Sequence, residues 1–266
     1  MRLEIGLLGD SRAPLARRHP LAKLAAGALL MLALFAAVDI VTPLILLLLL
    51  IAAVPASGLR PMTLLGRIFP LLIAGTAIAI LNTLFAPEQA GAPVHIGPLA
   101  LGQTTMLEGA AVGLRIVGIA LAGVLALATI EPTDLADALV QNLHAPPRFA
   151  LGALAALRML PVLADEWRLI GLARRARGME AGRNPVVALR IAAGRLFALL
   201  VAAIRRGTRL ALAMDARGFG ERPCRTVARP RGMTQADWLL MGGALLAGGA
   251  ATGVSLALGS YRLLFG

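Results

Sequence analysis

An eight-residue segment ending in Ala-Arg-Gly plus one apolar residue occurs twice in the chain, forty positions apart. The first copy is Leu172–Met179, and the second is Leu212–Phe219. Each copy follows a long stretch in which apolar residues recur at helical spacing, so each is predicted to end an amphipathic helix. Five of the eight positions are identical: Leu172/Leu212, Ala173/Ala213, Ala176/Ala216, Arg177/Arg217 and Gly178/Gly218.

The repeated residues suit a helix end that binds another surface. A glycine adopts the left-handed conformation that closes a helix, and an arginine in the last turn lies at the negative end of the helix dipole. The small alanine permits close approach, and a long arginine at a compact helix end fits an acidic groove. A single copy would indicate no more than a capped helix. Two copies on consecutive helices favour a binding function for Ala176, Arg177, Gly178, Ala216, Arg217 and Gly218.

Residues for catalysis or metal binding form no recognisable pattern. The only lysine is Lys23, so the chain has no Gly-Lys-Ser/Thr phosphate-binding loop and is not a P-loop ATPase. The histidines His19, His95 and His144 belong to separate segments, and no His, Cys or carboxylate cluster has metal-site spacing. We therefore predict no catalytic, cofactor-binding or metal-binding residues, and we expect any ATP to be bound by a partner.

One arginine, Arg115, falls inside a predicted membrane helix, where a charge is costly and usually faces protein. Glu108 lies seven residues earlier, on roughly the same helix face but too far for a pair between neighbouring turns. Two interpretations stay open for these residues. They contact another subunit or lock helices together, or Arg115 is a structural residue satisfied by backbone carbonyls.

The composition indicates which elements must position these residues. The 266 residues are 58% hydrophobic and 15% charged, with a mean hydropathy of +0.80, which excludes disorder and argues against a soluble globular protein. A membrane-spanning helix needs about 20 apolar residues. The uncharged runs are 24–38, 40–59, 68–87, 116–130 and 238–261. The first suffices if Lys23 snorkels to the interface, and the fourth if it includes Arg115, which gives a helix of about 106–130.

We therefore predict an all-α polytopic membrane protein with about five transmembrane helices and a cytoplasmic domain of amphipathic coupling helices. The predicted parts are a leader (1–23), four transmembrane helices (24–130), the coupling-helix domain (131–236), and a last transmembrane helix with a short external tail (237–266).

Several local features are predicted within these parts. Asp39 and Pro43 are predicted to lie near the turn of a tight helical hairpin. The Pro- and Gly-rich segment 86–105 is predicted to form an irregular or hairpin-like external loop. The coupling domain is predicted to contain helices near 134–143, 148–177 and 185–217. Pro161 is predicted to kink or divide the second of these.

The charge distribution predicts the orientation. The net charge is +12, of which +3 lies in residues 1–23 and +9 in residues 130–235. Loops rich in Lys and Arg stay in the cytoplasm. We therefore expect a multi-pass protein of the cell (inner or plasma) membrane with a cytoplasmic N-terminus.

The motifs together resemble one family, the transmembrane T component of energy-coupling factor (ECF) transporters of the CbiQ/BioN/EcfT type. The resemblance covers nearly the whole chain and rests above all on the paired Ala-Arg-Gly motifs. The other matching segments are His19–Leu24, Glu108–Arg115, Thr129–Leu135 and Leu157–Glu166.

This resemblance implies a non-catalytic scaffold subunit of an ABC importer. Such a subunit joins a substrate-binding membrane subunit, the S component, to two ATPase subunits, identical or homologous, which bind the ATP and Mg²⁺. In that family each Ala-Arg-Gly helix end docks in a groove of one ATPase, so Arg177 and Arg217 are expected to be the docking residues. The implied cargo is a vitamin, a vitamin precursor, or a cobalt or nickel ion.

Two other functions were weighed. The first is an integral membrane enzyme that acts on anionic lipid or phosphate substrates at the cytoplasmic interface, but Asp134, Asp137, Asp165, Glu166 and Asp215 form no recognisable site. The second is a membrane anchor for nucleic acid. The basic block has few aromatic side chains with which to stack on bases, so we expect no nucleic-acid partner.

Overall fold

The structure is a computed structural model that describes residues 13–37, 39–59, 61–86, 91–96, 99–179, 182, 184–219 and 230–259. The chain divides into two compact units, with boundaries after Ala138 and after Pro230. We call the part before the first boundary, together with residues from 231 onward, the membrane unit. We call residues 139–230 the paired-helix unit, and each unit is described by itself.

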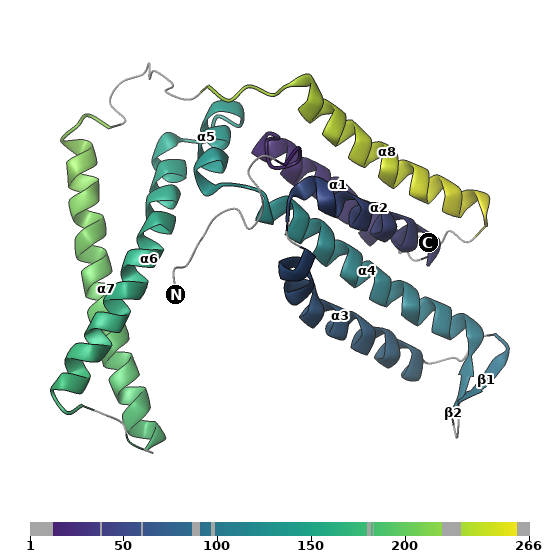
Figure 1. Cartoon of the computed structure of the whole chain (residues 1–266), viewed down its shortest axis with the longest axis horizontal. Helices are drawn as coiled ribbons and strands as arrows, with labels where there is room; N and C mark the ends of the chain where they lie inside the picture. The colour runs from purple at the N-terminus through teal and green to yellow at the C-terminus, as the bar shows by residue number, and fades with distance from the viewer. Residues whose placement is uncertain are drawn as a thin grey trace. The chain divides into compact units, whose positions relative to one another are not determined.

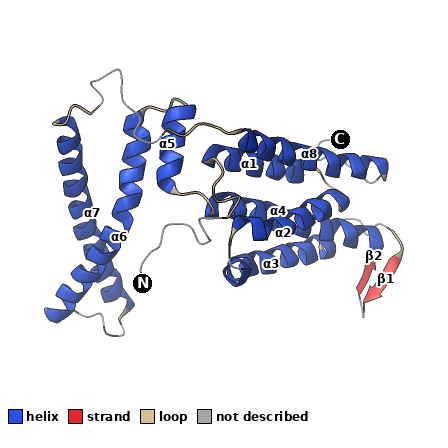
Figure 2. Cartoon of the chain, turned by 45° about the horizontal axis from the view of Figure 1, so that its top comes forward, coloured by secondary structure: helices blue, strands red, loops and turns tan. Residues whose placement is uncertain are grey.

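The membrane unit contains five helices, each close to a predicted membrane helix. They are α1 (Pro20–Ala36), α2 (Val41–Ser57), α3 (Pro61–Leu84), α4 (Gln103–Ala128) and α8 (Gln235–Ala257). Between α3 and α4, strands β1 (Pro93–Ile96) and β2 (Leu99–Gly102) form an antiparallel hairpin, as the turn-rich sequence suggested (Figure 2). The prediction of a helical polytopic membrane fold is confirmed, with this short hairpin as its described β element.

The core of the membrane unit lies where α1 and α2 pack against α4 and α8 (Figure 1). Leu34 and Leu46 are completely buried there. The other side of these helices carries exposed apolar side chains, such as Leu32 and Leu48, which are 64% and 59% exposed. Apolar groups on both sides of a helix are typical of a protein whose outer surface faces lipid.

Helix α3 packs closely on α4 through residues without large side chains. A β-carbon on Gly113 would lie 2.9 Å from both the Ala79 Cβ and the Gly75 carbonyl oxygen. A β-carbon on Gly75 would in turn lie 2.8 Å from a methyl group of Val117. Small residues at a four-residue spacing allow this backbone approach, which is a common way for membrane helices to associate.

The paired-helix unit is built from two long helices, α6 (Pro147–Ala176) and α7 (Pro185–Asp215). A shorter helix, α5 (Pro132–Asn142), precedes them and crosses the boundary between the units. Helix α7 begins at Asn184, whose side-chain oxygen accepts hydrogen bonds from two backbone amides of the first turn. Helix α6 continues through Pro161, so this proline does not divide the segment, and the alternative of a kink stays a prediction. Each helix is about 45 Å long at 1.5 Å per residue.

Four of the described helices are long and apolar enough to cross a membrane by length and composition alone, namely α4, α6, α7 and α8. Helices α1 and α2 and the segment Ile68–Leu84 are apolar but shorter. Two of the four long helices, α6 and α7, are those that the sequence places in the cytoplasm because of their arginines. The count of five spans therefore stays a prediction.

Candidate docking ends of the paired helices

The first Ala-Arg-Gly segment closes α6 with a specific set of backbone hydrogen bonds. Gly178 has φ +73°, the left-handed conformation predicted for it. Its amide donates to the Arg175 carbonyl at 2.8 Å, and the Met179 amide donates to the Arg174 carbonyl at 3.0 Å. These two bonds define a Schellman motif, in which Arg177 is the C-cap residue and Met179 follows the glycine.

The second segment closes α7 with the same bonds at equivalent positions. Gly218 has φ +70°, and its amide donates to the Asp215 carbonyl at 2.9 Å. The Phe219 amide donates to the Met214 carbonyl at 3.1 Å. The sequence repeat is therefore a structural repeat, and the conformation predicted for both glycines is confirmed.

The two arginines lie at the ends of an antiparallel helix pair. Early residues of α6 lie near late residues of α7, since Arg148 and Phe219 line the same cavity, while Arg174 near the end of α6 bonds to Ile191 near the start of α7. Figure 1 shows the two helices crossing. Arg177 and Arg217 are both exposed, and neither forms an ion pair with a described residue. The unit therefore presents two equivalent cationic tips at its opposite ends.

Arginine side chains hold the crossing of α6 and α7 together. The Arg174 guanidinium donates to the Ile191 carbonyl at 3.0 Å, and Arg195 donates to the Trp167 carbonyl at 3.0 Å. Arg195 also stacks on the Trp167 ring, with its Cζ 4.4 Å from the centroid, a favourable cation–π geometry. Arg206 pairs with Glu166 at 3.0 Å. The partners in these contacts could not be predicted from the sequence, because each contact joins positions on separate helices.

At its crossing with α6, helix α7 turns two arginines toward α6, and several of its large apolar side chains are exposed. Arg195 and Arg206 contact α6, whereas Leu189 is 72% exposed and Phe197 is 69% exposed. No residue of α7 is buried. In a water-soluble helix pair most large apolar side chains face inward, whereas these side chains of α7 are exposed. The outer face of α7 is therefore suited to contact with lipid or with an apolar protein surface.

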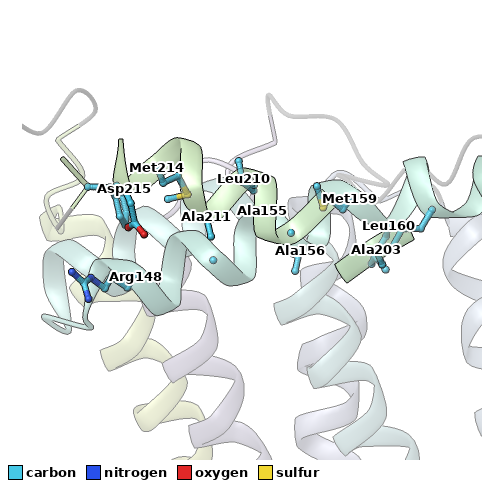
Figure 3. A pocket seen from close by; sticks show the side chains of 14 residues that line it. Arg148, Ala155, Ala156, Met159, Leu160, Ala203, Leu210, Ala211, Met214 and Asp215 are labelled. Carbon is cyan, nitrogen blue, oxygen red and sulfur yellow. The ribbon is translucent and has the colours of Figure 1, made fainter. Parts of the chain in front are cut away.

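An apolar cavity of about 570 Å³ lies between the first half of α6 and the second half of α7 (Figure 3). Small and apolar residues line most of it, including Ala155, Met159 and Met214. Arg148 and Asp215 lie together at one end, and Leu160 lies toward the other. This cavity adjoins the second Ala-Arg-Gly motif, since Met214 and Asp215 supply the carbonyls that hold its cap.

The structure does not pair Arg115 with Glu108. The Arg115 guanidinium donates instead to the Ala37 carbonyl at the end of α1, while Glu108 is exposed on α4. Close by in the chain, Asp39 is 6% exposed and accepts hydrogen bonds at 2.7 Å from the Thr42 amide. It accepts another at 2.7 Å from the Ser255 hydroxyl of α8. The carbonyl contact joins α4 to the end of α1, so it fits both a structural role and an interhelical lock. A role of Arg115 toward another subunit stays a prediction.

The predicted snorkelling of Lys23 is wrong, because this residue is only 4% exposed. Its ammonium donates to the Ala16 and Thr129 carbonyls at 2.8 Å each, so it joins the segment before α1 to the end of α4. Nearby in the chain, the His19 amide donates to the Asp237 carboxylate of α8 at 2.9 Å. The only lysine therefore fastens helix ends to each other rather than reaching water.

Comparison with known proteins assigns this arrangement to a family. The sequence profile of CbiQ, described as cobalt transport protein, matches residues 11–226, a range that includes both Ala-Arg-Gly motifs. The chain belongs to the CbiQ family. The resemblance to ECF transporter T components stated from the motifs is thereby confirmed.

Individual relatives of this CbiQ-family chain agree. The energy-coupling factor transporter transmembrane protein EcfT of Heliobacterium modesticaldum is 30% identical over 233 residues, which cover 85% of this chain and 87% of the relative. EcfT of Lacticaseibacillus paracasei is 32% identical over 161 residues, or 57% of this chain and 61% of the relative. An ABC transporter ATP-binding protein of Bifidobacterium longum is 30% identical over 183 residues, which cover 64% of this chain but 23% of that protein.

Proposed function

We propose that this chain is the membrane scaffold of an ECF-type importer and that it couples two partner ATPases to a substrate-binding membrane subunit. The observation that carries the proposal is the duplicated helix end. Two helices close with the same hydrogen bonds and present an exposed arginine at the same position. The antiparallel pairing separates these ends by roughly one helix length, about 45 Å. Two equivalent sites at that separation suit two similar partners, one at each end.

The partner is proposed to be an ABC ATPase. This chain has no phosphate-binding lysine loop of its own, so ATP binding must come from another protein. The Bifidobacterium longum relative supports the pairing, since a protein described as ATP-binding contains a segment similar to this chain. When the ATPases close on ATP, both arginine-tipped helices are displaced, and the motion passes mechanically through the scaffold. Catalysis belongs to the ATPases, and this chain acts as a non-catalytic subunit.

The apolar outer face of α7 supports contact with a membrane partner. Val186, Leu189, Phe197 and Ile204 are each at least 60% exposed along it. Such a face is stable when lipid or an apolar protein surface covers it. We propose that the substrate-binding subunit covers part of this face, so that movement of the helices reorients it. Selectivity for a vitamin, a vitamin precursor, or a cobalt or nickel ion resides in that subunit.

The orientation follows from the same assignment. ATP is available on the cytoplasmic side, so the paired-helix unit must be cytoplasmic, which agrees with its large excess of arginine. The basic leader then lies on the same side, and the β1–β2 hairpin lies outside. The protein is proposed to be a multi-pass component of the cell membrane.

Charge reversal at the two tips tests this function. Arg177→Glu and Arg217→Glu should each remove one ATPase from the purified complex, and the double variant should remove both. Loss of an interfacial charge pair costs about 2–5 kcal/mol, which weakens binding by about 30-fold or more. The measurement is the amount of ATPase that co-purifies with the tagged chain from membranes.

Arg209→Glu is the matched control, since Arg209 is an exposed arginine on α7 outside both caps. It introduces the same charge change and should leave co-purification intact. Unchanged binding of both ATPases by the double variant would contradict the docking assignment. So would equal losses in the double variant and in Arg209→Glu.

A further inference from the structure

A second cavity lies at the end of α6, beside the first Ala-Arg-Gly motif. It has a volume of about 420 Å³ and is lined by Arg174, Arg175 and Met179 from the end of α6 and by Ile191 and Arg195 from α7, among others. None of the described residues that line it is acidic. Three arginines therefore line one hollow, and the described part of the chain supplies no acidic residue to its wall.

Two of these guanidinium groups are held in place. Arg174 is fixed by its bond to the Ile191 carbonyl and lies over Gly194, where a β-carbon would come within 2.9 Å of its Nη1. Arg195 is fixed by Trp167 and lies over Gly171, which likewise leaves no room for a β-carbon. The two glycines of α6 and α7 thus make space for the arginines of the opposite helix.

The fixed arginines retain free hydrogen-bond donors. A guanidinium carries five N–H groups, and the described bonds to carbonyl groups use one from Arg174 and one from Arg195. The Arg195 Nε is buried and donates no hydrogen bond. Arg175 is exposed and forms no ion pair with a described residue. Such pre-oriented donors bind carboxylates and phosphates, and on the surface of a partner protein the matching group is the carboxylate of an Asp or Glu side chain.

We propose that this cavity binds a carboxylate side chain of the ATPase that docks on Arg177, an inference that rests on the proposed function. The cavity and the docking tip share one helix end. Arg174 and Arg175 provide the carbonyls that hold the cap, and Met179 belongs to both the cap and the cavity wall. A protein that covers Arg177 therefore covers the cavity as well.

The other end of the pair lacks this chemistry. Met214 and Asp215 stand at the positions of Arg174 and Arg175, and the neighbouring cavity is largely apolar. The ATPase that binds at Arg177 must therefore present an extra acidic residue. The ATPase that binds at Arg217 must instead accept the Asp215 carboxylate and present apolar groups to the neighbouring cavity. The two ends are not interchangeable, and they fix which ATPase surface binds at which helix.

A zero-length cross-link tests the inference, because the chain has only one lysine and Lys23 is buried. In the purified complex, Arg175→Lys adds a single amine at the cavity. A water-soluble carbodiimide activates a nearby carboxylate, and the amine displaces the resulting urea to form an amide. Mass spectrometry should find that position 175 is joined to an Asp or Glu of an ATPase. Arg209→Lys, which places an amine on the exposed surface of α7, should not give this product.

Binding measurements complete the test. Arg175→Gln should weaken ATPase binding about tenfold at low salt and much less at high salt, while Arg209→Gln should have no effect. The inference is overturned if the R175K amine joins a carboxylate of its own chain, if R209K gives an equal yield, or if R175Q binds normally. Arg177→Glu in the same preparation separates the two proposals. If it abolishes ATPase binding while one of these three results is obtained, the cavity proposal is wrong and the docking function of Arg177 is still supported.

Discussion

Replacing Gly178 with alanine should weaken the attachment of one ATPase by about 5- to 30-fold. The residue has φ +73°, and no atom lies within 4 Å of the position a β-carbon would take, so the cost is purely one of backbone conformation. An L-residue in this conformation costs about 1–2 kcal/mol. A cost of this size lowers the ratio of closed to open caps by about 5- to 30-fold. The two cap bonds are then lost, and with them the position of Arg177.

The assay is a titration of the purified, detergent-solubilised chain with its ATPases, with the apparent Kd as readout. Gly178→Asn should give an intermediate loss, since asparagine tolerates the left-handed conformation better than alanine does. Gly218→Ala should act equally on the other end, because its φ is +70°.

The matched control is Gly207→Ala, in the interior of α7, where a β-carbon also meets nothing within 4 Å. Alanine should stabilise this helix by about 0.5–1 kcal/mol and leave binding unchanged. The reasoning is refuted if Gly178→Ala binds like the unmodified chain. It is also refuted if Gly207→Ala loses as much affinity as Gly178→Ala.

Two further predictions concern the membrane unit. Lys23→Met should lower the free energy of unfolding by roughly 1–3 kcal/mol, because the buried Thr129 carbonyl and the half-buried Ala16 carbonyl lose their donor. Thermal unfolding in detergent measures this, and an unchanged melting temperature would contradict it. Gly113→Leu should separate α3 from α4 and cost about 1–3 kcal/mol through overpacking. Gly66→Leu, at an open position of α3, is its control, and equal proteolytic sensitivity of the two variants would refute the packing argument.

The sequence predicted the features that depend on local physics. The left-handed conformation of Gly178 and Gly218 followed from their place after an amphipathic helix, and the turn-rich segment before α4 gave a hairpin. Pro161 does not divide its helix, because the helix around it continues and retains enough hydrogen bonds to tolerate one missing donor. A proline penalty is a local cost that a long helix can absorb.

Contacts between distant positions could not be predicted in this way. Asp39 and Ser255 are 216 residues apart, and their hydrogen bond arises only once α2 and α8 pack together. Lys23 was expected at the membrane interface because it directly precedes the apolar run 24–38. Its partners are two backbone carbonyls, which every residue has, so the sequence does not show which of them accept hydrogen bonds from a side chain. The same holds for Arg174 and Arg195, whose positions depend on glycines of the opposite helix.

The joint between α6 and α7 explains how such a pair could transmit force in the proposed scaffold. Apolar packing at the crossing is sparse, since no residue of α7 is buried. Directional contacts take its place, with Arg195 held by the Trp167 carbonyl and ring and Arg206 paired with Glu166. Such contacts fix the crossing, while cavities of about 420 and 570 Å³ remain beside it toward the two ends. In the proposed scaffold, a displacement of the Arg217 tip would turn α7 about this joint, and the exposed apolar face of α7 would move with it.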